Sequence, residues 1–316
     1  MKPADRHFET IQNEGYSWID IQKPIRNDME ELGKNFPFHK LNREDCLSKI
    51  QLPKVDKYED HMFIILHFPP LKKEKNGPKF SQLCIFIGKN YLITVHQGDL
   101  DPLVEMFLNC KTNENERKTL LGKSPGYLLH KIIDVLVDEL FHTLKKIESN
   151  LDEIEEDVFD ERKSDALEIS ALRREITSLR RIVMPLRRII LEISKDIGHF
   201  STQDLTLYFD DVVDHIDKVI ETLEDSKETM EIYKDSDFML STQKTNKILA
   251  ILTIVFTLSI PASVIAAFYG MNVNFPGSNM EPWTLLGRYT TLIFVLIASG
   301  IPTVFMLWFF KRRGWI

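Results

Sequence analysis

Residues 248–269 read ILAILTIVFTLSIPASVIAAFY, a run of 22 residues without a charged side chain. A second uncharged run of 22 residues, YTTLIFVLIASGIPTVFMLWFF, covers residues 289–310. The hydrocarbon core of a bilayer requires about 20 apolar residues in a helix, and both runs reach that length. Helices in the core of a soluble protein are usually shorter and keep a polar face. The two runs therefore predict a hairpin of two transmembrane helices.

The cations that flank these runs predict the orientation of the hairpin. Lys244 and Lys247 precede the first run. Three more cations follow the second run, namely Lys311, Arg312 and Arg313. The segment between the runs contains a single cation, Arg288. Because segments rich in Lys and Arg stay in the cytoplasm, we expect a multi-pass protein of the plasma membrane with cytoplasmic N- and C-termini and an external loop.

The charge balance differs between the two parts of the chain. Residues 1–243 hold 46 of the 47 acidic residues and 34 of the 40 Lys and Arg residues. Such an asymmetry indicates two physical environments. An excess of acid argues against nucleic acid as a partner, because phosphates attract Lys and Arg. It is compatible with cations as partners.

Cysteine usage and the first residues indicate the compartment. The three cysteines, Cys46, Cys84 and Cys110, are widely spaced and odd in number. This pattern indicates neither a zinc knuckle nor a disulfide framework, and it suits a reducing compartment. Residues 1–15, MKPADRHFETIQNEG, have no apolar core and do not resemble a secretory signal. The first part of the chain is expected in the cytoplasm.

Residues 1–126 predict a mixed α/β domain. Three short segments are rich in β-branched and aromatic residues and predict strands: His61–Phe68, Gln82–Ile87 and Tyr91–His96. Gly88-Lys89-Asn90 has the composition of a hairpin turn between the last two.

Beyond residue 126 the apolar residues recur at spacings of three and four, which predicts long helices. The pattern breaks at Arg162–Ser164, so residues 127–205 predict two antiparallel helices. A third helix is expected to begin near Thr206. No Gly or Pro occurs between Thr206 and Ile260, so this helix is expected to continue into the first apolar run over about 90 to 100 Å. Such a stalk would transmit movement to the bilayer.

Enzymatic motifs are lacking in the sequence. There is no GxGxxG, GxxxxGK[ST] or GxSxG pattern, so neither an enzyme nor an organic cofactor is predicted. His61, His67 and His96 show no metal-binding spacing and predict packing or surface roles. The acidic run 152–157 and the stalk carboxylates near Asp211 are more typical of solvated helix faces than of metal sites.

Two transmembrane helices cannot enclose a pathway, so a channel built from this chain must be an oligomer. The first helix is the better lining, because it carries more small polar residues, and such residues turn toward the interior of a helix bundle or toward water. These residues, at or within the ends of the helix, are Asn246, Thr253, Thr257, Ser259, Ser263 and Asn272.

Gly270-Met271-Asn272 follow the first apolar run. A ring of Asn272 amides would hold a hydrated Mg²⁺ through its water molecules, because Mg²⁺ loses water reluctantly. Binding of this kind is weak enough to permit release, as conduction requires. Gly and Asn are also common where helices end, so capping is an equally good interpretation of the residues alone.

Several motifs together resemble the CorA family of magnesium transporters over most of the chain. The strongest is Tyr269-Gly270-Met271-Asn272 between two C-terminal spans, followed by a basic tail. Other similar segments are Pro53–Val55, Phe63–His67, Pro185–Arg187, Tyr208–His215, Asn246 and Pro261. The resemblance implies a CorA-like funnel, in which an α/β cytoplasmic domain is joined by a stalk helix to a transmembrane hairpin.

The resemblance also implies the activity. A homopentamer would pass Mg²⁺, and often Co²⁺ or Ni²⁺, down its gradient without ATP. Gly270, Met271 and Asn272 would form the outer selectivity filter. The pore lining and its hydrophobic gate would consist of Asn246, Leu249, Leu252, Ile260 and Ser263.

By the same resemblance, Asp211 matches an intracellular metal-sensing carboxylate at subunit contacts, with Glu74 as a weaker partner. Mg²⁺ would then be both the transported and the regulatory ion. High internal Mg²⁺ would bridge acidic groups of neighbouring subunits and hold a closed state, which requires tighter binding to that state. When Mg²⁺ falls, the carboxylates would repel one another and the pore would open.

The expected organisation has seven parts. They are the α/β domain at 1–126, the antiparallel helices at 127–205, the stalk at 206–247, the pore-lining helix at 248–272, the external loop at 273–288, the second transmembrane helix at 289–310 and the basic tail at 311–316.

Two departures from the family pattern leave the ion preference open. The external loop reads Asn279–Trp283, with Glu281 in a shifted position, where many members have Met-Pro-Glu-Leu. Several gate positions are Leu or Ile where some relatives have Met. A Zn²⁺ or Co²⁺ transporter of the same fold and a non-conducting membrane-anchored metal sensor or scaffold are the alternatives.

Overall fold

The computed structural model describes residues 8–13, 15–48, 51–70, 80–158, 166–271 and 289–314. The chain forms two compact units, Met1–Asp235 and Ser236–Ile316. The division into seven parts made from the sequence stays a prediction.

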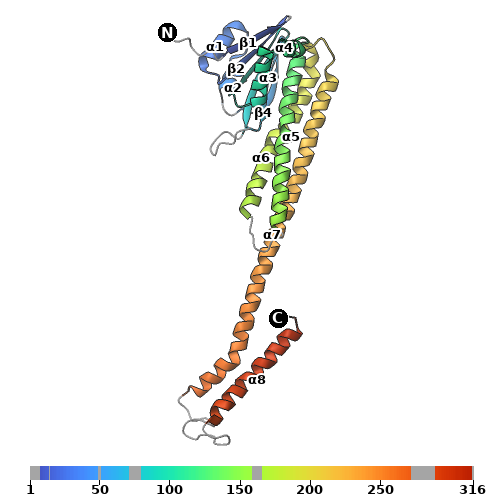
Figure 1. Cartoon of the computed structure of the whole chain (residues 1–316). Helices are drawn as coiled ribbons and strands as arrows, with labels where there is room; N and C mark the ends of the chain where they lie inside the picture. The colour runs from blue at the N-terminus through green and yellow to red at the C-terminus, as the bar shows by residue number, and fades with distance from the viewer. Residues whose placement is uncertain are drawn as a thin grey trace. The chain divides into compact units, whose positions relative to one another are not determined.

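The first unit contains a six-stranded sheet with the order β1-β2-β6-β5-β4-β3 (Figure 1). Its strands are β1 Phe8–Asn13, β2 Tyr16–Gln22, β3 Lys54–Lys57, β4 His61–Phe68, β5 Ser81–Gly88 and β6 Tyr91–His96. Every pair is antiparallel except β2 and β6, which run parallel. The three strands predicted from the sequence are confirmed, within one residue at each end.

Both faces of the sheet are covered by helices. All eight residues of β4 are buried, as is typical of a strand enclosed on both sides. Successive side chains of a strand point to opposite faces. Accordingly, Ile64 belongs to a core with α3, α4 and the long helices, whereas Phe63 belongs to a core with α1 and α2. These short helices are α1 Arg26–Asn35, α2 Lys40–Leu47, α3 Asp101–Thr112 and α4 Glu114–Leu121.

Three long helices follow the sheet: α5 Pro125–Val158, α6 Ala166–Asp196 and α7 Thr206–Tyr269. A short 3-10 helix, Ile197–Phe200, lies between α6 and α7. Apolar residues spaced by three and four form the buried stripe of each helix, for example Leu144, Ile147 and Leu151 on α5. The predicted start of the third helix at Thr206 is confirmed, and α7 continues without a break through 64 residues.

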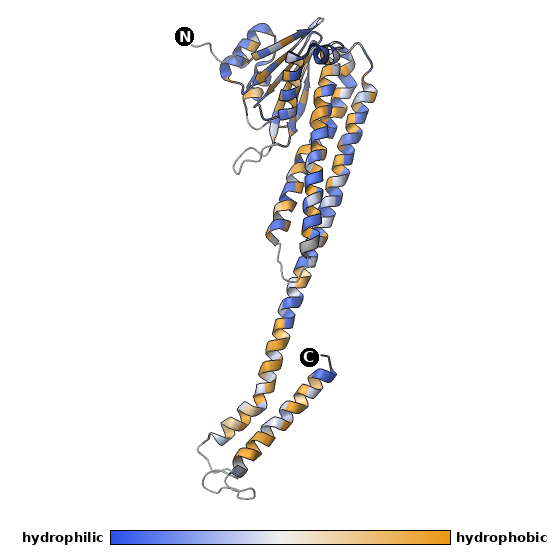
Figure 2. Ribbon diagram, viewed as in Figure 1, coloured by the Kyte–Doolittle hydropathy of each residue, from blue (hydrophilic) through white to orange (hydrophobic). Residues whose placement is uncertain are grey.

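The second unit contains the end of α7 and the helix α8, Thr290–Arg312. Figure 2 shows both as predominantly apolar. Both are long and apolar enough to cross a membrane, and almost none of the residues in their most apolar stretches is buried within the chain. Pro261 and Pro302 lie inside these helices.

The three cysteines of the chain, Cys46, Cys84 and Cys110, are all free thiols in the first unit. Each is buried, with at most 4% of its surface exposed. Burial, followed by the neighbouring Cys84 thiol, raises the pKa of Cys46 well above its ordinary value. Burial also raises the pKa of Cys110 to about 11.

Candidate metal centre and pore helix

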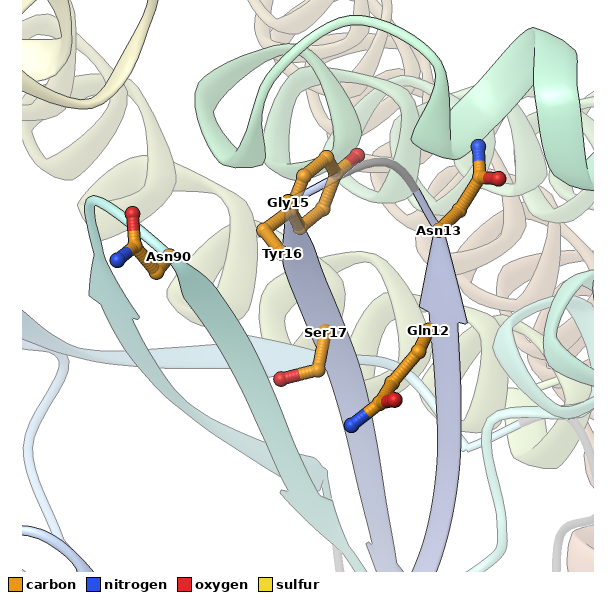
Figure 3. Close-up of a pocket in the computed structure, with 6 residues that line it drawn as sticks. All are labelled: Gln12, Asn13, Gly15, Tyr16, Ser17 and Asn90. Carbon is orange, nitrogen blue, oxygen red and sulfur yellow. The ribbon is translucent and has the colours of Figure 1, made fainter.

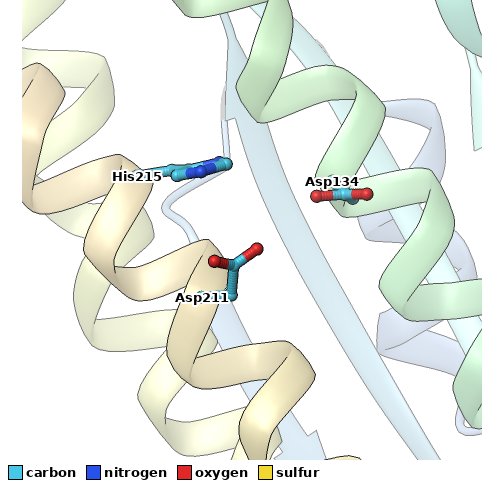
Figure 4. A group of neighbouring side chains, drawn as sticks. All are labelled: Asp134, Asp211 and His215. Carbon is cyan, nitrogen blue, oxygen red and sulfur yellow. The ribbon is translucent and has the colours of Figure 1, made fainter.

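A group of metal-ligating side chains lies between α5 and α7 in the first unit. Asp134 comes from α5, whereas Asp211 and His215 lie one helical turn apart on α7 and therefore on the same face (Figure 4). One ligand atom from each residue lies within 4.8 Å of the other two. Asp211 is exposed, and the other two are half-buried. This cluster can hold one metal ion.

The surroundings of this cluster contain more negative than positive charge. Lys131 Nζ lies 2.9 Å from Asp134 Oδ2, and Asp138 Oδ1 lies 3.5 Å from His215 Nδ1. Burial, followed by the charge of Asp134, raises the pKa of Asp138. Three carboxylates thus share one ammonium group, and a bound cation would relieve their mutual repulsion.

His130 lies on α5 one helical turn before Asp134 and is a buried neighbour of this cluster. It is 2% exposed, and its ring centre lies 5.2 Å from that of Tyr208 and 5.7 Å from that of Phe209. Burial lowers the pKa of His130, so the imidazole is neutral at physiological pH and adds no positive charge.

The donor set of the cluster suits more than one divalent ion. Carboxylate oxygens are the preferred ligands of Mg²⁺, whereas imidazole nitrogen favours Co²⁺, Ni²⁺ and Zn²⁺. His215 Nδ1 is shielded from solvent and has no hydrogen-bond partner among the described residues. The nitrogen is therefore available to a metal without loss of an existing hydrogen bond.

The residues predicted to line the pore all lie on α7, and the structure places them on one face. At about 100° per residue, they fall within an arc of about 120° around the helix. All five are exposed within the single chain. They are Asn246, Leu249, Leu252, Ile260 and Ser263. Their role in the pore stays a prediction.

The helix α7 ends at Tyr269, immediately before the predicted filter. Gly270 N donates to Ala266 O at 2.9 Å, and Met271 N donates to Phe268 O at 3.2 Å. Gly270 does not have the left-handed backbone of a common glycine cap, because its φ lies outside that region. Asn272, Glu74 and Glu281 lie outside the described residues, so their roles stay predictions.

The Ser259 hydroxyl, two residues before Pro261, does not replace the hydrogen bond that this proline removes. A proline at position 261 leaves the carbonyl of Thr257 without its helical donor. Ser259 Oγ donates instead to the carbonyl of Phe256 at 2.7 Å.

The basic tail lies at the end of α8. Lys311 and Arg312 occupy its last turn, and Arg313 caps it. The Arg312 guanidinium lies 5.3 Å from the centre of the Trp308 ring. Cation–π contacts of this kind, next to an aromatic residue at the end of a span, are typical of the interface between lipid and water.

A cavity of about 470 Å³, separate from this cluster, lies between the β1–β2 hairpin and the turn that precedes β6 (Figure 3). Its lining side chains are neutral and are contributed by Gln12, Asn13, Tyr16, Ser17 and Asn90. The Tyr16 hydroxyl donates to Leu120 O at 3.3 Å. With no charged side chain among these residues, the cavity is less suited to a divalent cation than the cluster on α5 and α7.

Two members of the cluster were missed by sequence reasoning. His215 follows Asp211 by four residues, and this helical spacing was a signal that could have indicated a shared face. Asp134 gives no such signal, because it precedes Asp211 by 77 positions and meets it only through the packing of α5 beside α7.

An α/β domain, long helices, a cluster of metal-ligating side chains and two apolar C-terminal helices define an integral membrane transporter of metal ions. The chain belongs to the family of CorA-like Mg²⁺ transporter proteins, which it matches over residues 13–312. Membership of this family makes divalent-cation transport the activity of the chain.

Individual relatives agree with this assignment. The cobalt/magnesium transport protein CorA of Thermotoga maritima is 28% identical over 95% of this chain and 83% of its own length. The solved structure of the CorA magnesium transporter from Methanocaldococcus jannaschii is similar with a TM-score of 0.79 at 20% identity, covering 97% of this chain and 93% of that one. The full-length CmaX protein is similar with a TM-score of 0.74 at 18% identity, covering 95% and 89%. The predicted fold, a CorA-like funnel, is confirmed.

Proposed function

We propose that the chain forms a homopentameric channel in the plasma membrane, with both termini in the cytoplasm, through which Mg²⁺ enters passively and without ATP. Co²⁺ and Ni²⁺ are further permeant ions. Intracellular Mg²⁺ closes the pore. The observation that supports this proposal best is a stripe of small polar residues along the apolar part of α7.

The small polar residues of the first span share one side of the helix. At about 100° per residue they fall within an arc of about 160°, and that arc includes the predicted pore face. We call this arc the polar stripe; its members are Asn246, Thr253, Thr257, Ser259 and Ser263. In a bilayer such a stripe turns away from lipid, toward neighbouring helices or water. Several copies of α7 around one axis would give the stripe a common aqueous path.

Gating is assigned to the cluster of Asp134, Asp211 and His215. A divalent ion there neutralises repelling carboxylates and ties α7 to α5, which favours one arrangement of the two helices. Asp211 is exposed, which leaves it open to a neighbouring subunit, and Glu74 stays its predicted partner there. Bound Mg²⁺ stabilises the closed state only if it binds that state more tightly than the open one.

Selectivity is assigned to Gly270, Met271 and Asn272 at the end of α7. Neutral amide oxygens of Asn272 would accept hydrogen bonds from the water of hydrated Mg²⁺ and leave its inner shell intact. Weak contacts of this kind allow the ion to leave, which conduction requires. Glu281 and the basic tail would add an attractive charge outside and a positive charge inside.

Uptake of Mg²⁺ into liposomes that contain the purified protein tests this proposal. A trapped Mg²⁺-sensitive dye reports entry for the wild type, for Asn272→Ala and for the control Asn274→Ala. Rapid entry that is lost only in Asn272→Ala supports the channel and its filter. If well-folded pentamers with a Mg²⁺-free interior admit no Mg²⁺, the proposal is wrong, and a membrane-anchored sensor or scaffold becomes the better interpretation.

His215 supports a second candidate, a transporter of Zn²⁺ or Co²⁺ with the same fold. Imidazole is a better ligand for these ions than for Mg²⁺. The same liposomes distinguish the two candidates when Zn²⁺, Co²⁺ and Mg²⁺ are supplied separately. Entry of Zn²⁺ that depends on a pH gradient, together with negligible entry of Mg²⁺, supports the second candidate.

A further inference from the structure

A cavity of about 430 Å³ lies in the first unit, between the C-terminal half of α6 and the end of β3. Its charged lining is mainly basic: Lys57 comes from β3, and α6 contributes Arg187, Arg188 and Lys195. Among the described residues that line it, Glu192 is the one acidic side chain. Cavities of this volume accommodate small-molecule ligands, and the surplus of positive charge indicates an anion.

The cavity lies at the end of a basic repeat on α6. Arginine pairs recur every seven residues, at 173–174, 180–181 and 187–188. Seven residues are close to two helical turns, so the three pairs lie above one another on one side of the helix. Only the last pair lines the cavity, where β3 adds a further cation. The anion site is therefore confined to this end of the repeat.

Two of the four cations already have carboxylate partners. Arg187 Nε lies 2.5 Å from Asp217 Oδ1, and Arg187 Nη2 lies 3.1 Å from Asp217 Oδ2. Lys57 Nζ lies 2.5 Å from Asp196 Oδ2 and 3.5 Å from Glu192 Oε1. These ion pairs orient the two side chains, and the uncompensated positive charge comes from the other two cations.

Arg188 and Lys195 make no ion pair with a described residue. Arg188 Nη2 donates to Pro53 O at 3.3 Å, a neutral acceptor, so the guanidinium is oriented while its charge stays uncompensated. The two residues are seven positions apart, which places their backbones about 10 Å apart along α6. That separation suits an anion whose charge is distributed along its length better than a single small ion.

The chemistry of the lining indicates the class of ligand. A guanidinium presents a planar set of N–H donors that matches the oxygens of a phosphate group, and an ammonium adds a point charge. Met184 and Leu191 also line the cavity, and Met184 is 47% exposed. An apolar surface beside several cations suits a phosphate compound that also carries an organic group.

We propose that this cavity binds a chain of two or three phosphate groups, either free or attached to a nucleoside. Arg187 and Arg188 contact the oxygens at one end of the chain, and Lys195 contacts the other end. The site shares no residue with the metal cluster of α5 and α7. It goes beyond the proposed channel, because its residues all belong to the first unit of a single chain.

Titration calorimetry of the purified full-length protein, stripped of metal and in a Mg²⁺-free buffer, tests this site. ATP and inorganic tripolyphosphate are supplied separately, and saturable binding of at least one is expected. Tighter binding of ATP supports contact of the nucleoside with Met184 and Leu191. Equal affinities support recognition of the phosphate chain alone. If neither compound binds the wild type saturably, the site is wrong.

Substitutions locate the binding. Arg188→Ala should lower the affinity at least about tenfold and Lys195→Ala about threefold, because each removes a charged donor to phosphate. Arg188→Lys should lose less than Arg188→Ala, since it keeps the charge. Arg181→Ala is the matched control, one repeat earlier on the same side of α6 and outside the cavity, and should change the affinity little. Asp211→Asn should also bind normally, because no metal is present to bridge phosphate to the cluster.

The control decides between a site and a general attraction to the basic helix. Equal losses in Arg181→Ala and Arg188→Ala overturn the site, because they indicate binding along the whole repeat. If Arg188→Ala does not fold, Lys195→Ala provides the second measurement, since its ammonium makes no ion pair with a described residue. An unchanged affinity in Lys195→Ala then contradicts the site.

Discussion

The Tyr233 hydroxyl donates a hydrogen bond of 2.8 Å to Glu155 Oε2, which joins α7 to the last turns of α5. The ring of Tyr233 is buried, whereas Glu155 is exposed. Burial, followed by the nearby Glu155 carboxylate, raises the pKa of Tyr233 to about 12. The phenol therefore keeps its proton at physiological pH and remains a hydrogen-bond donor to Glu155.

Tyr233→Phe should weaken this link with little change in packing. A hydrogen bond to a charged group is worth about 1.5 to 3 kcal/mol, and less where the charge is exposed to water as it is in Glu155. The variant should therefore lose about 1 kcal/mol and melt about 3 °C lower. Tyr208→Phe, which removes a hydroxyl from a partly exposed ring on the same helix, is the control. Equal melting temperatures for wild type and Tyr233→Phe, in thermal unfolding of the purified protein, contradict the prediction.

The stability of the first unit should fall in mildly acidic solution because of His67. Burial lowers the pKa of His67 to about 4, from an ordinary value of 6.5, and its ring stacks on Phe80 at 3.9 Å. Between these values the unfolded chain binds a proton that the folded chain does not. This contribution is complete above pH 6.5 and is lost as the pH falls toward 4.

His67→Phe keeps the stacking but removes the titration. The difference in melting temperature between wild type and this variant should therefore depend on pH, and it should favour the variant increasingly from pH 7 to pH 4.5. Thermal unfolding of both proteins across that range measures it. Parallel curves with a constant offset would falsify the role of His67.

Thr94 holds a buried polar network between the parallel strands β2 and β6. Its hydroxyl donates to Asp20 Oδ1 at 2.5 Å and accepts from Trp18 Nε1 at 3.1 Å. Gly98 N donates to His96 Nδ1, so the proton of His96 lies on Nε2 and is donated to Asp20 Oδ1 at 3.1 Å. Replacing the hydroxyl leaves a buried indole N–H without a partner.

Thr94→Val should cost about 2 kcal/mol, which is typical of one unsatisfied buried polar group. Thr94→Ser keeps the hydroxyl and is the control, with a smaller loss. Chemical unfolding followed by the fluorescence of the buried Trp18 indole reports the difference. Unchanged stability of Thr94→Val contradicts the prediction, because valine keeps the packing of the methyl group and removes only the hydroxyl.

The donor set of the metal cluster predicts how two substitutions differ. His215→Ala should weaken Co²⁺ binding at least about tenfold and Mg²⁺ binding little, because imidazole contributes mainly to the softer ion. Asp211→Asn should weaken both. Asp214→Asn removes an equal charge one residue before His215 and is the control. Titration calorimetry of the full-length protein, first stripped of metal, measures the affinities, and equal losses of Co²⁺ and Mg²⁺ affinity in His215→Ala contradict a ligand role for the imidazole.

The parts of the fold that follow local patterns were predictable. The strand β4 is apolar throughout, and the stripes of α5, α6 and α7 recur at helical spacing. The strands β1, β2 and β3 were not predicted. The strand β1 is mostly polar and β3 has only four residues, so neither has a strong apolar alternation. Pairing of β2 with β6 brings together residues about 74 positions apart, which only the tertiary fold determines.

Only part of the candidate site was predicted, because patterns within one segment do not show which distant segments meet. Asp211 and the pore face were identified through family resemblance and helical phase, both of which depend on residues within one segment. Asp134 required knowledge of which face of α5 meets α7.

The burial of all three native cysteines makes the chain convenient for site-directed labelling. Only a thiolate reacts readily with alkylating reagents, and Cys46 and Cys110 combine inaccessibility with a raised pKa. The folded wild-type protein should therefore react slowly with a water-soluble maleimide. A single cysteine introduced along α7 could then be labelled with little reaction of the native cysteines, and the native cysteines would not need to be replaced. Spin labels and fluorophores attached in this way would report how far the helix moves when internal Mg²⁺ is withdrawn.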